Sequence, residues 1–286
     1  ASTVDINYVG TTGTANNFTA PSGNISVGCS GTCTYATALT IASGKSLTVG
    51  STSPVNTTAR LDMGSNALTL TSATATVHGF LRSAGTFTGA SATTLTFSST
   101  GTYEHNFTTT AGTIPTATWS TGSTCSIIGY TSFLTGPSSG LNQTFSNFTW
   151  NCSSQGGSAN LAGGLTAVNG TLSVVSTGSP TVRELRLATS NGSAFTASYG
   201  AINISGGILA LIGSSTSGSN TSAVTVSGDV TISGSGILDL NGGSNAGSAT
   251  LNIGGNLATS GTSIIQKSFG ATGTINFNKS SGTQTF

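Results

Sequence analysis

The chain has 286 residues, only 5% of them are charged, and seven Lys or Arg against six Asp or Glu give a formal net charge of +1. Soluble domains usually carry charge on about 25% of their residues. Because these few charges are scattered singly, the sequence has no basic patch for nucleic acid or an anionic membrane. No apolar run reaches the roughly 18 residues that a membrane-spanning helix needs.

The composition predicts an all-β protein. Hydrophobic residues make up 35% of the chain and are regularly spaced, which distinguishes it from a disordered low-complexity chain despite its 41 glycines. Thr, Val, Ile and Phe favour strands, and Gly and Asn favour the turns between them. Strong helix formers are scarce, and no amphipathic helix pattern occurs.

The four cysteines predict two disulfides. Cys29 and Cys33 flank Gly31, which permits a tight loop, so we expect them to pair. Cys125 and Cys152 are 27 residues apart, about one repeat, and we expect them to join neighbouring coils. An even number of cysteines fits an oxidising compartment, and the start Ala1-Ser-Thr-Val4 fits a mature terminus left after signal removal.

The stretch from Ala38 to Gly50 contains Gly44-Lys45-Ser46, the end of a phosphate-binding P-loop motif. A P-loop requires a second glycine five positions before Gly44, and Leu39 stands there. Apolar and polar residues alternate on both sides of the motif. This pattern predicts two strands with Gly44 as the turn, and no nucleotide site.

Internal repeats are the main indication of the fold. A triplet of Leu, Thr and a bulky apolar residue begins at Leu39, Leu68 and Leu95, at offsets of 29 and 27. Further along, a longer pattern lines up in three segments, 202–208, 224–230 and 251–257, at offsets of 22 and 27, and a last copy begins at Ile275.

Units of this size cannot bury an apolar face alone, so stacking must supply the core. We therefore predict a β-solenoid, similar to a parallel β-helix, with irregular repeats of about 22 to 29 residues; the alternative is a tandem β-sandwich. We expect one elongated domain over residues 1–286. Residues 101–155 blur the repeat and predict a wider coil or an insertion.

Several patterns contain residues that could carry chemistry, but none predicts a catalytic, cofactor or metal site. Gly136-Pro-Ser138-Ser-Gly140 matches a nucleophile elbow, but no helical pattern follows it. His78 and His105 lack the spacing of metal ligands and are expected to be surface or hydrogen-bonded residues. The carboxylates are far apart in sequence, and Glu184 between Arg183 and Arg186 indicates a surface ion pair.

Thr-x-Thr patterns recur in the first half of the chain. They begin at Thr69, Thr74, Thr94 and Thr116. Regular Thr ladders on a flat solenoid face can order water and bind ice. Because the copies are not spaced by one constant coil length, we expect Thr simply to fill outward strand positions.

Five segments carry a family resemblance: GTYEHNF, GTIPTATW, GSTCSIIGYTS, GLNQTFSNFTWNCSSQ and GTINFNKSSGTQTF. They resemble recurring segments of large, repetitive, secreted surface proteins of bacteria that use type IX secretion. The resemblance spans about residues 38–286. It implies an extracellular, β-rich, adhesin-like or structural protein, and it supplies no catalytic residues.

The sequence therefore predicts a secreted structural subunit of an extracellular filament or surface adhesin, without catalysis or cofactors. A carbohydrate-binding adhesin is the nearest alternative, with Tyr103, Trp119 or Trp150 as sugar-stacking platforms, although both tryptophans are expected in the core. An ice-binding protein and a polysaccharide-degrading β-helix enzyme are further alternatives.

N-glycosylation is also predicted, because a surface with so little charge has little colloidal repulsion. Twelve N-x-S/T sequons occur, at Asn17, Asn24, Asn56, Asn106, Asn142, Asn147, Asn151, Asn169, Asn191, Asn203, Asn220 and Asn278.

Head-to-tail self-assembly is expected from the two ends. Strand patterns occur at both, with Val4, Ile6 and Tyr8 at one end and Ile275, Phe277 and Phe286 at the other. Asp5 is the only charge in the first forty residues and Lys279 the only one in the last dozen, so neither edge is protected by charge. The contact would be heterologous and would propagate as a filament.

Overall fold

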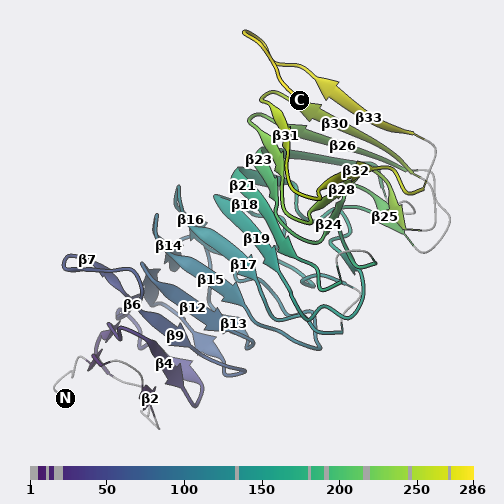
Figure 1. Cartoon of the computed structure of the whole chain (residues 1–286). Coiled ribbons are helices and arrows are strands. Elements are labelled where there is room, and N and C mark those ends of the chain that lie inside the picture. The colour runs from purple at the N-terminus through teal and green to yellow at the C-terminus, as the bar shows by residue number, and fades with distance from the viewer. Residues whose placement is uncertain are drawn as a thin grey trace. The chain divides into compact units, whose positions relative to one another are not determined.

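The computed structural model of the chain describes residues 6–10, 13–15, 22–132, 135–179, 182–189, 193–214, 220–243, 247–269 and 272–286 (Figure 1). Every regular element within these ranges is a β-strand. None of the described residues belongs to a helix that could cross a membrane. Val4, which is predicted to belong to an edge strand, and the sequons at Asn17 and Asn191 lie outside the described residues.

The chain divides into two compact units, each described here by itself. Unit 1 comprises residues 1–107 and 112–126, and unit 2 comprises residues 108–111 and 127–286. The boundary falls within residues 101–155, where the repeat blurs in the sequence. In both units the strands of successive coils pair in parallel, and the predicted β-solenoid is confirmed. A β-sandwich would require antiparallel sheets.

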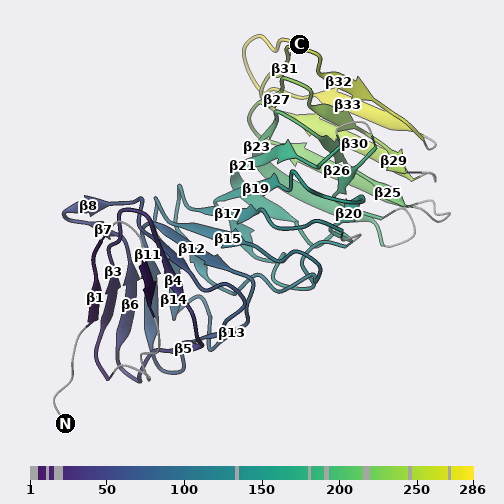
Figure 2. The same cartoon turned by 60° about the horizontal axis from the view of Figure 1, so that its bottom comes forward.

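Three sheets form the sides of unit 1. Sheet 1A contains β1 (Ile6–Tyr8), β3 (Ile25–Val27), β6 (Ser46–Val49), β11 (Thr74–Val77), β14 (Leu95–Phe97) and β16 (Thr118–Trp119). The strands from β1 to β14 lie side by side in Figure 2. Sheet 1B contains β2 (Gly13–Ala15), β4 (Thr32–Tyr35), β9 (Arg60–Asp62), β12 (Phe80–Ser83) and β15 (Thr102–His105). Sheet 1C contains β5 (Leu39–Thr40), β10 (Leu68–Thr69) and β13 (Phe87–Thr88). An antiparallel hairpin, β7 (Ser51–Thr52) and β8 (Val55–Asn56), is inserted after β6. Strand β17 (Thr124–Ile127) crosses the unit boundary.

Unit 2 has one long sheet and one shorter sheet. Sheet 2A contains β18 (Thr144–Phe145), β19 (Asn147–Asn151), β21 (Ala167–Ser176), β23 (Phe195–Ile204), β26 (Thr221–Val226), β27 (Val230–Ile232), β30 (Ser248–Ile253), β31 (Leu257–Thr259) and β33 (Gly273–Phe277). Sheet 2B contains β20 (Ala159–Asn160), β22 (Glu184–Arg186), β24 (Ile208–Ala210), β28 (Ile237–Asp239) and β32 (Ile264–Gln266). A short pair joins β25 (Gly213–Ser214) and β29 (Gly242–Gly243).

The core consists of columns of apolar side chains that run from coil to coil. In sheet 1A, Val27, Val49, Val77 and Phe97 occupy one register position and are all at most 2% exposed. Because alternate strand residues face opposite sides, the residues between them point outward. Each coil thus covers the apolar row of the coil before it, as the repeat size required.

The sequence alignment of the repeats was right in part. Leu39 pairs with Leu68 as predicted, and Val224 pairs with Leu251. Leu95 does not continue the Leu39 column, because it lies in sheet 1A opposite Ala75.

The segment that begins at Ile202 was also misaligned. Ile202 pairs with Val230, and the partner of Val224 is Ala197. The Leu95 error arises because similar triplets recur on different sides of the same coil, and the Ile202 error arises because the long strand β23 pairs with both β26 and β27.

Candidate functional site

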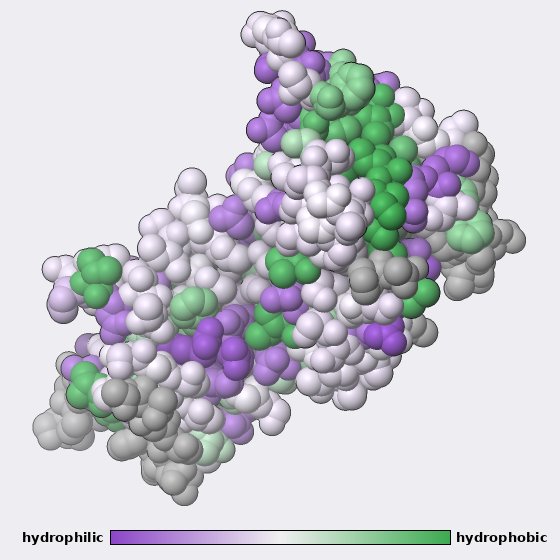
Figure 3. Space-filling view, in the orientation of Figure 1, coloured by the Kyte–Doolittle hydropathy of each residue, from purple (hydrophilic) through white to green (hydrophobic). Residues whose placement is uncertain are grey.

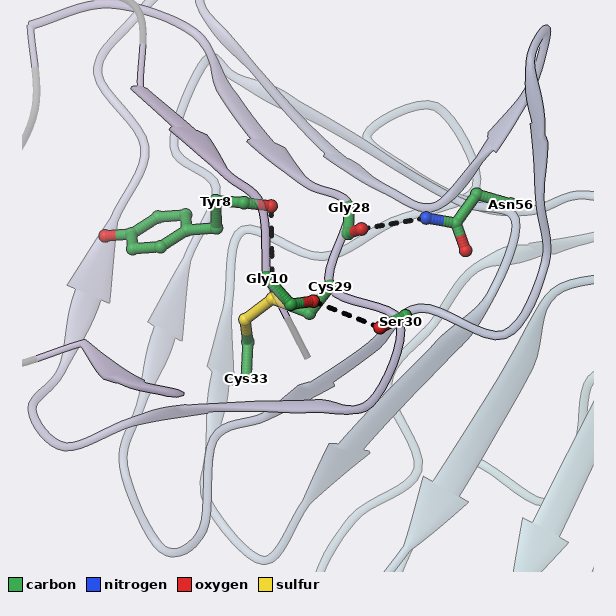
Figure 4. The surroundings of a disulfide bond; sticks show 7 residues. All are labelled: Tyr8, Gly10, Gly28, Cys29, Ser30, Cys33 and Asn56. Carbon is green, nitrogen blue, oxygen red and sulfur yellow. Dashed lines mark hydrogen bonds between the residues drawn. A yellow bond between two sulfur atoms is a disulfide. The ribbon is translucent and has the colours of Figure 1, made fainter. Parts of the chain in front are cut away.

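The predicted disulfide between Cys29 and Cys33 is confirmed; their Cα atoms are 6.2 Å apart (Figure 4). Its loop is fixed to the coil before it, because Gly28 N donates to the carbonyl of Tyr8 at 2.7 Å. From the other side, Asn56 Nδ2 in the inserted hairpin donates to the carbonyl of Gly28 at 2.9 Å. The disulfide therefore closes a corner between β3 and β4 that three coils hold in place.

The predicted Cys125–Cys152 disulfide is wrong: both cysteines are free thiols and both are fully buried. Cys152 Sγ lies 3.6 Å from the carbonyl oxygen of Ile127 and donates to it. Ile127 follows Cys125 by two residues, a step of about 6.6 Å along a strand. A separation of one repeat in sequence thus does not place the two sulfur atoms in register.

A charge ladder on the outer face of sheet 1B is the main polar cluster of unit 1. Arg60 and Arg82 each bond Glu104, with nitrogen to oxygen distances of 2.7 Å, and Asp62 lies 3.8 Å from Arg82. The Arg60 guanidinium also lies over the Phe80 ring, 4.6 Å from its centre. Register brings these residues together, since Asp62, Arg82 and Glu104 occupy one position in β9, β12 and β15.

The charge ladder is unsuited to hydrolysis of a polysaccharide. A pair of carboxylates in a glycosidase must leave room for a water or a sugar ring between them. Here Arg82 stands between Asp62 and Glu104, and Glu104 is only 7% exposed with both oxygens bonded to arginine. Among the residues that the structure describes, no group of three or more His, Cys, Asp and Glu is placed to hold a metal ion.

The GKS motif and the two histidines take part in turns and hydrogen bonds of the fold. Gly44 has a φ of +70° in the turn between β5 and β6, as the strand reading of the GKS motif predicts. His105 is buried and its Nδ1 lies 3.2 Å from the Tyr103 hydroxyl, and His78 Nδ1 lies 2.9 Å from Ser98 Oγ. Both histidines are therefore hydrogen-bonded, as expected.

An open cavity of about 890 Å³ in unit 2 is lined by the whole stretch from Gly136 to Gly140, with Arg186 at its wall. The chain continues from Gly140 into β18 and β19 without a helix, so Ser138 does not lie at a nucleophile elbow. Arg186 Nε bonds Glu184 at 2.5 Å, so the predicted ion pair is present, but its side chains are only 15% and 12% exposed and it is largely buried rather than at the surface.

The predicted sugar-stacking platforms are not available on the surface. Tyr103 and Trp150 are both 0% exposed, and the half-buried Trp119 stacks on Phe97 with ring centres 4.5 Å apart. These rings pack against neighbouring coils and are not free to stack on a sugar. The expectation that the tryptophans lie in the core is confirmed for Trp150.

The described sequon asparagines all lie at the surface or partly at the surface. Exposed positions are Asn24, Asn142, Asn151, Asn169, Asn203 and Asn278, and half-buried positions are Asn56, Asn106, Asn147 and Asn220. Asn147 Oδ1 accepts a bond from Thr171 N at 3.0 Å, and Asn56 anchors the disulfide corner. The exposed set is the more accessible for modification.

The last coil of unit 2 exposes apolar side chains. Phe269 is 48% exposed, Phe277 41%, and Phe286 93%. In sheet 2B, Ile208, Ile237 and Ile264 share one register position, and Ile264 in the last strand is the most exposed. Figure 3 shows a hydrophobic stripe along this part of unit 2, where β28 and β32 lie.

Comparison of the chain with known protein families, curated proteins and solved structures gives no match.

Proposed function

We propose that this chain is a non-catalytic structural unit of an extracellular filament or surface adhesin, and that copies join head to tail through the end coils of the solenoid. The observation that carries the proposal is the outer edge of β33. No described strand pairs with that edge, and apolar side chains gather beside it.

The hydrogen-bonding direction of β33 follows from its flanks. The carbonyl of Thr272 accepts a bond from Ala249 N, and Asn278 N donates to the carbonyl of Ile253. Since residues alternate along a parallel strand, Gly273, Ile275 and Phe277 direct their backbone N–H and C=O groups away from β30. Such a row of backbone groups is a template for another strand.

The residues after β33 fold against the adjacent corner. Thr285 O accepts a bond from Leu257 N at 3.0 Å, Gln284 Nε2 donates to the carbonyl of Ile253, and Phe286 stacks on Phe277. These contacts lie beside β31. Residues Thr283–Phe286 alternate like a strand in the sequence, but they form none, because backbone, Gln284 side-chain and aromatic contacts hold this segment at the corner.

The complementary edge is β1 in unit 1. Ile6 N donates to the carbonyl of Asn24, and the carbonyl of Tyr8 accepts from Gly28 N, so Asn7 directs its backbone groups to the other side. No described strand pairs with that side of β1. A β33 edge meeting a β1 edge is a heterologous contact, which repeats without closing.

Three observations favour an extracellular setting. The Cys29–Cys33 disulfide fits an oxidising compartment, the low charge fits a surface that assembles or carries sugar, and six described sequons are exposed. The resemblance to secreted surface proteins points the same way. Glycans on these asparagines, secretion and adhesion are parts of the same proposal.

Replacing Phe277 tests the assembly. We expect the parent chain to form filaments in electron micrographs and light scattering, and we expect Phe277→Lys to abolish them because it places a charge beside the open edge. Val182→Lys is the matched control, because Val182 is 68% exposed before β22, away from the last coil. Circular dichroism verifies that both variants keep their fold.

A parent chain that stays monomeric at all concentrations contradicts the proposal. So does a folded Phe277→Lys variant that polymerises as the parent does.

A further inference from the structure

The outer face of sheet 1A carries two columns of hydroxyl side chains. In one column Thr48, Thr76, Thr96 and Thr118 occupy a single register position on four neighbouring strands. The second column lies two residues earlier, where Ser46 pairs with Thr74, and Thr94 and Thr116 precede Thr96 and Thr118 by the same step. We call these eight residues the threonine face.

The register holds although the coils differ in length. Successive members of the first column are 28, 20 and 22 residues apart in sequence. The threonines fill outward strand positions as expected, and the unequal spacing still yields a regular ladder because the corners absorb the extra residues. Three of the Thr-x-Thr patterns, those at Thr74, Thr94 and Thr116, therefore become one two-dimensional array.

The threonine face has neither charge nor aromatic rings. The residues between the two columns, Leu47, Ala75, Leu95 and Ala117, are at most 7% exposed and point into the core. The aromatic residues Phe97 and Trp119 follow Thr96 and Thr118 and lie on the opposite side of their strands.

The hydroxyls at the centre of the face are available to solvent. Those of Thr48, Thr74, Thr76 and Thr96 make no hydrogen bond to any residue that the structure describes. At the margin, Thr94 and Thr118 donate to the loop carbonyls of Gly89 and Ala92, at 2.7 Å each. The central hydroxyls thus have no competing partner within the described protein.

From this geometry we propose that the threonine face binds ice. Neighbouring members of one column are about 4.8 Å apart, which is the spacing of adjacent strands. The two columns are about 6.6 Å apart, which is two residues along a strand. Both spacings are close to the repeats of oxygen atoms on a prism face of hexagonal ice. The β-branched threonine has a restricted χ1, so its hydroxyl and methyl groups are held in a regular order before the lattice is met.

A crystalline polysaccharide is the other flat lattice that such a face can meet. Sugar rings are bound mainly by stacking on exposed aromatic rings. Because the rings of Phe97 and Trp119 lie on the other side of the sheet, the face offers hydroxyls and methyls alone, and ice is the favoured ligand.

Substitution at the centre of the face tests the proposal on the full chain. The parent is expected to shape ice crystals and to show thermal hysteresis, measured by nanolitre osmometry. Thr76→Lys, in the middle of the first column, is expected to lose both. Thr225→Lys is the matched control, because Thr225 is an exposed outward residue in the middle of a parallel strand of unit 2, in a column with Ser198 and Asn252.

The inference concerns unit 1 alone and is independent of head-to-tail assembly, so the assay is run on chains that sedimentation shows to be monomeric. A parent without thermal hysteresis overturns it. Equal loss in Thr76→Lys and Thr225→Lys, or no loss in a folded Thr76→Lys, overturns it as well. Binding of the parent to crystalline cellulose that Thr76→Lys abolishes, in the absence of ice activity, reassigns the face to polysaccharide.

Discussion

At the residue scale, Glu104 is the centre of the charge ladder because two arginines share its carboxylate. Replacing the carboxylate with an amide leaves Arg60 and Arg82 partly buried, with side chains 27% and 28% exposed, a neutral oxygen for only one of the bonds at 2.7 Å and an NH₂ group facing the other arginine. Charge-assisted bonds of this kind contribute more than neutral ones, and losing one partner exposes the full desolvation penalty of the other.

We therefore predict that Glu104→Gln lowers the free energy of unfolding by roughly 2 to 3 kcal/mol, measured by denaturant titration. Asp62→Asn is the matched control. Its carboxylate is 3.8 Å from Arg82, and its Oδ1 accepts Gly64 N at 2.8 Å, a bond that an asparagine oxygen can keep. Equal destabilisation by the two substitutions would contradict the central role of Glu104.

The buried thiols make a second prediction at this scale. Burial raises the pKa of the Cys152 thiol from 9.0 to about 12, and it raises the pKa of Cys125 as well. The folded state holds these protons more tightly than the unfolded state does. The thiols thus contribute stability that is fully present below pH 9 and is lost as the pH rises toward 12.

The parent is therefore expected to exceed Cys152→Ala in unfolding free energy by a margin that shrinks above pH 9. Comparing the two chains cancels the tyrosines, of which Tyr8 has a pKa raised to about 12 by burial. A difference in unfolding free energy that stays constant through this pH range would show that burial does not raise the pKa of the Cys152 thiol. In the folded chain, both thiols should also resist iodoacetamide until denaturant is added.

At the element scale, the corners between sheets 1A and 1B depend on glycines where successive coils approach closely. A Cβ added at Gly79 would lie against the carbonyl oxygen of Ala59, and one at Gly101 against that of Val77. These atoms are backbone and cannot move aside without shifting a coil.

Gly79→Ala is predicted to destabilise the chain by about 1 to 3 kcal/mol, measured by thermal and denaturant unfolding. Gly44→Asn is the control. Gly44 has a φ of +70° and open space around its Cα, and asparagine tolerates that conformation better than other residues do. A Gly79→Ala chain as stable as the parent would mean that the corner relaxes.

The same corners explain how much of the structure could be predicted from sequence. Alternation and repetition predict strands and stacking, because inward residues of successive coils cover one another in any solenoid, as Leu39 and Leu68 do. Which strands of successive coils pair depends on the lengths of the corners, and no local sequence pattern predicts those lengths. For that reason the charge ladder from Asp62 to Glu104 and the threonine face could not be assembled from sequence alone, and the Cys125–Cys152 pairing failed.

At the scale of the whole chain, both units stack successive coils through parallel strands, but they divide the coil differently. Unit 1 divides each coil among three short sides, and it carries the disulfide, the charge ladder and the threonine face. Unit 2 uses strands of up to ten residues, as in β21 and β23, and it carries the exposed apolar last coil. The proposed threonine face lies in unit 1, whereas the proposed assembly contact joins the β33 edge of unit 2 to the β1 edge of unit 1, so substitutions at Thr76 and Phe277 alter the two surfaces separately.

The inserted hairpin of β7 and β8 shows what this stacking permits. It adds residues between β6 and β9, yet Leu47 still pairs with Ala75 and Cys33 still pairs with Leu61. Residues can therefore be inserted or deleted at a corner without changing the register of the stacked side chains. The bend at Ser53 and Pro54, both exposed, is consequently the natural point at which to graft a foreign peptide and display it from an otherwise unchanged scaffold.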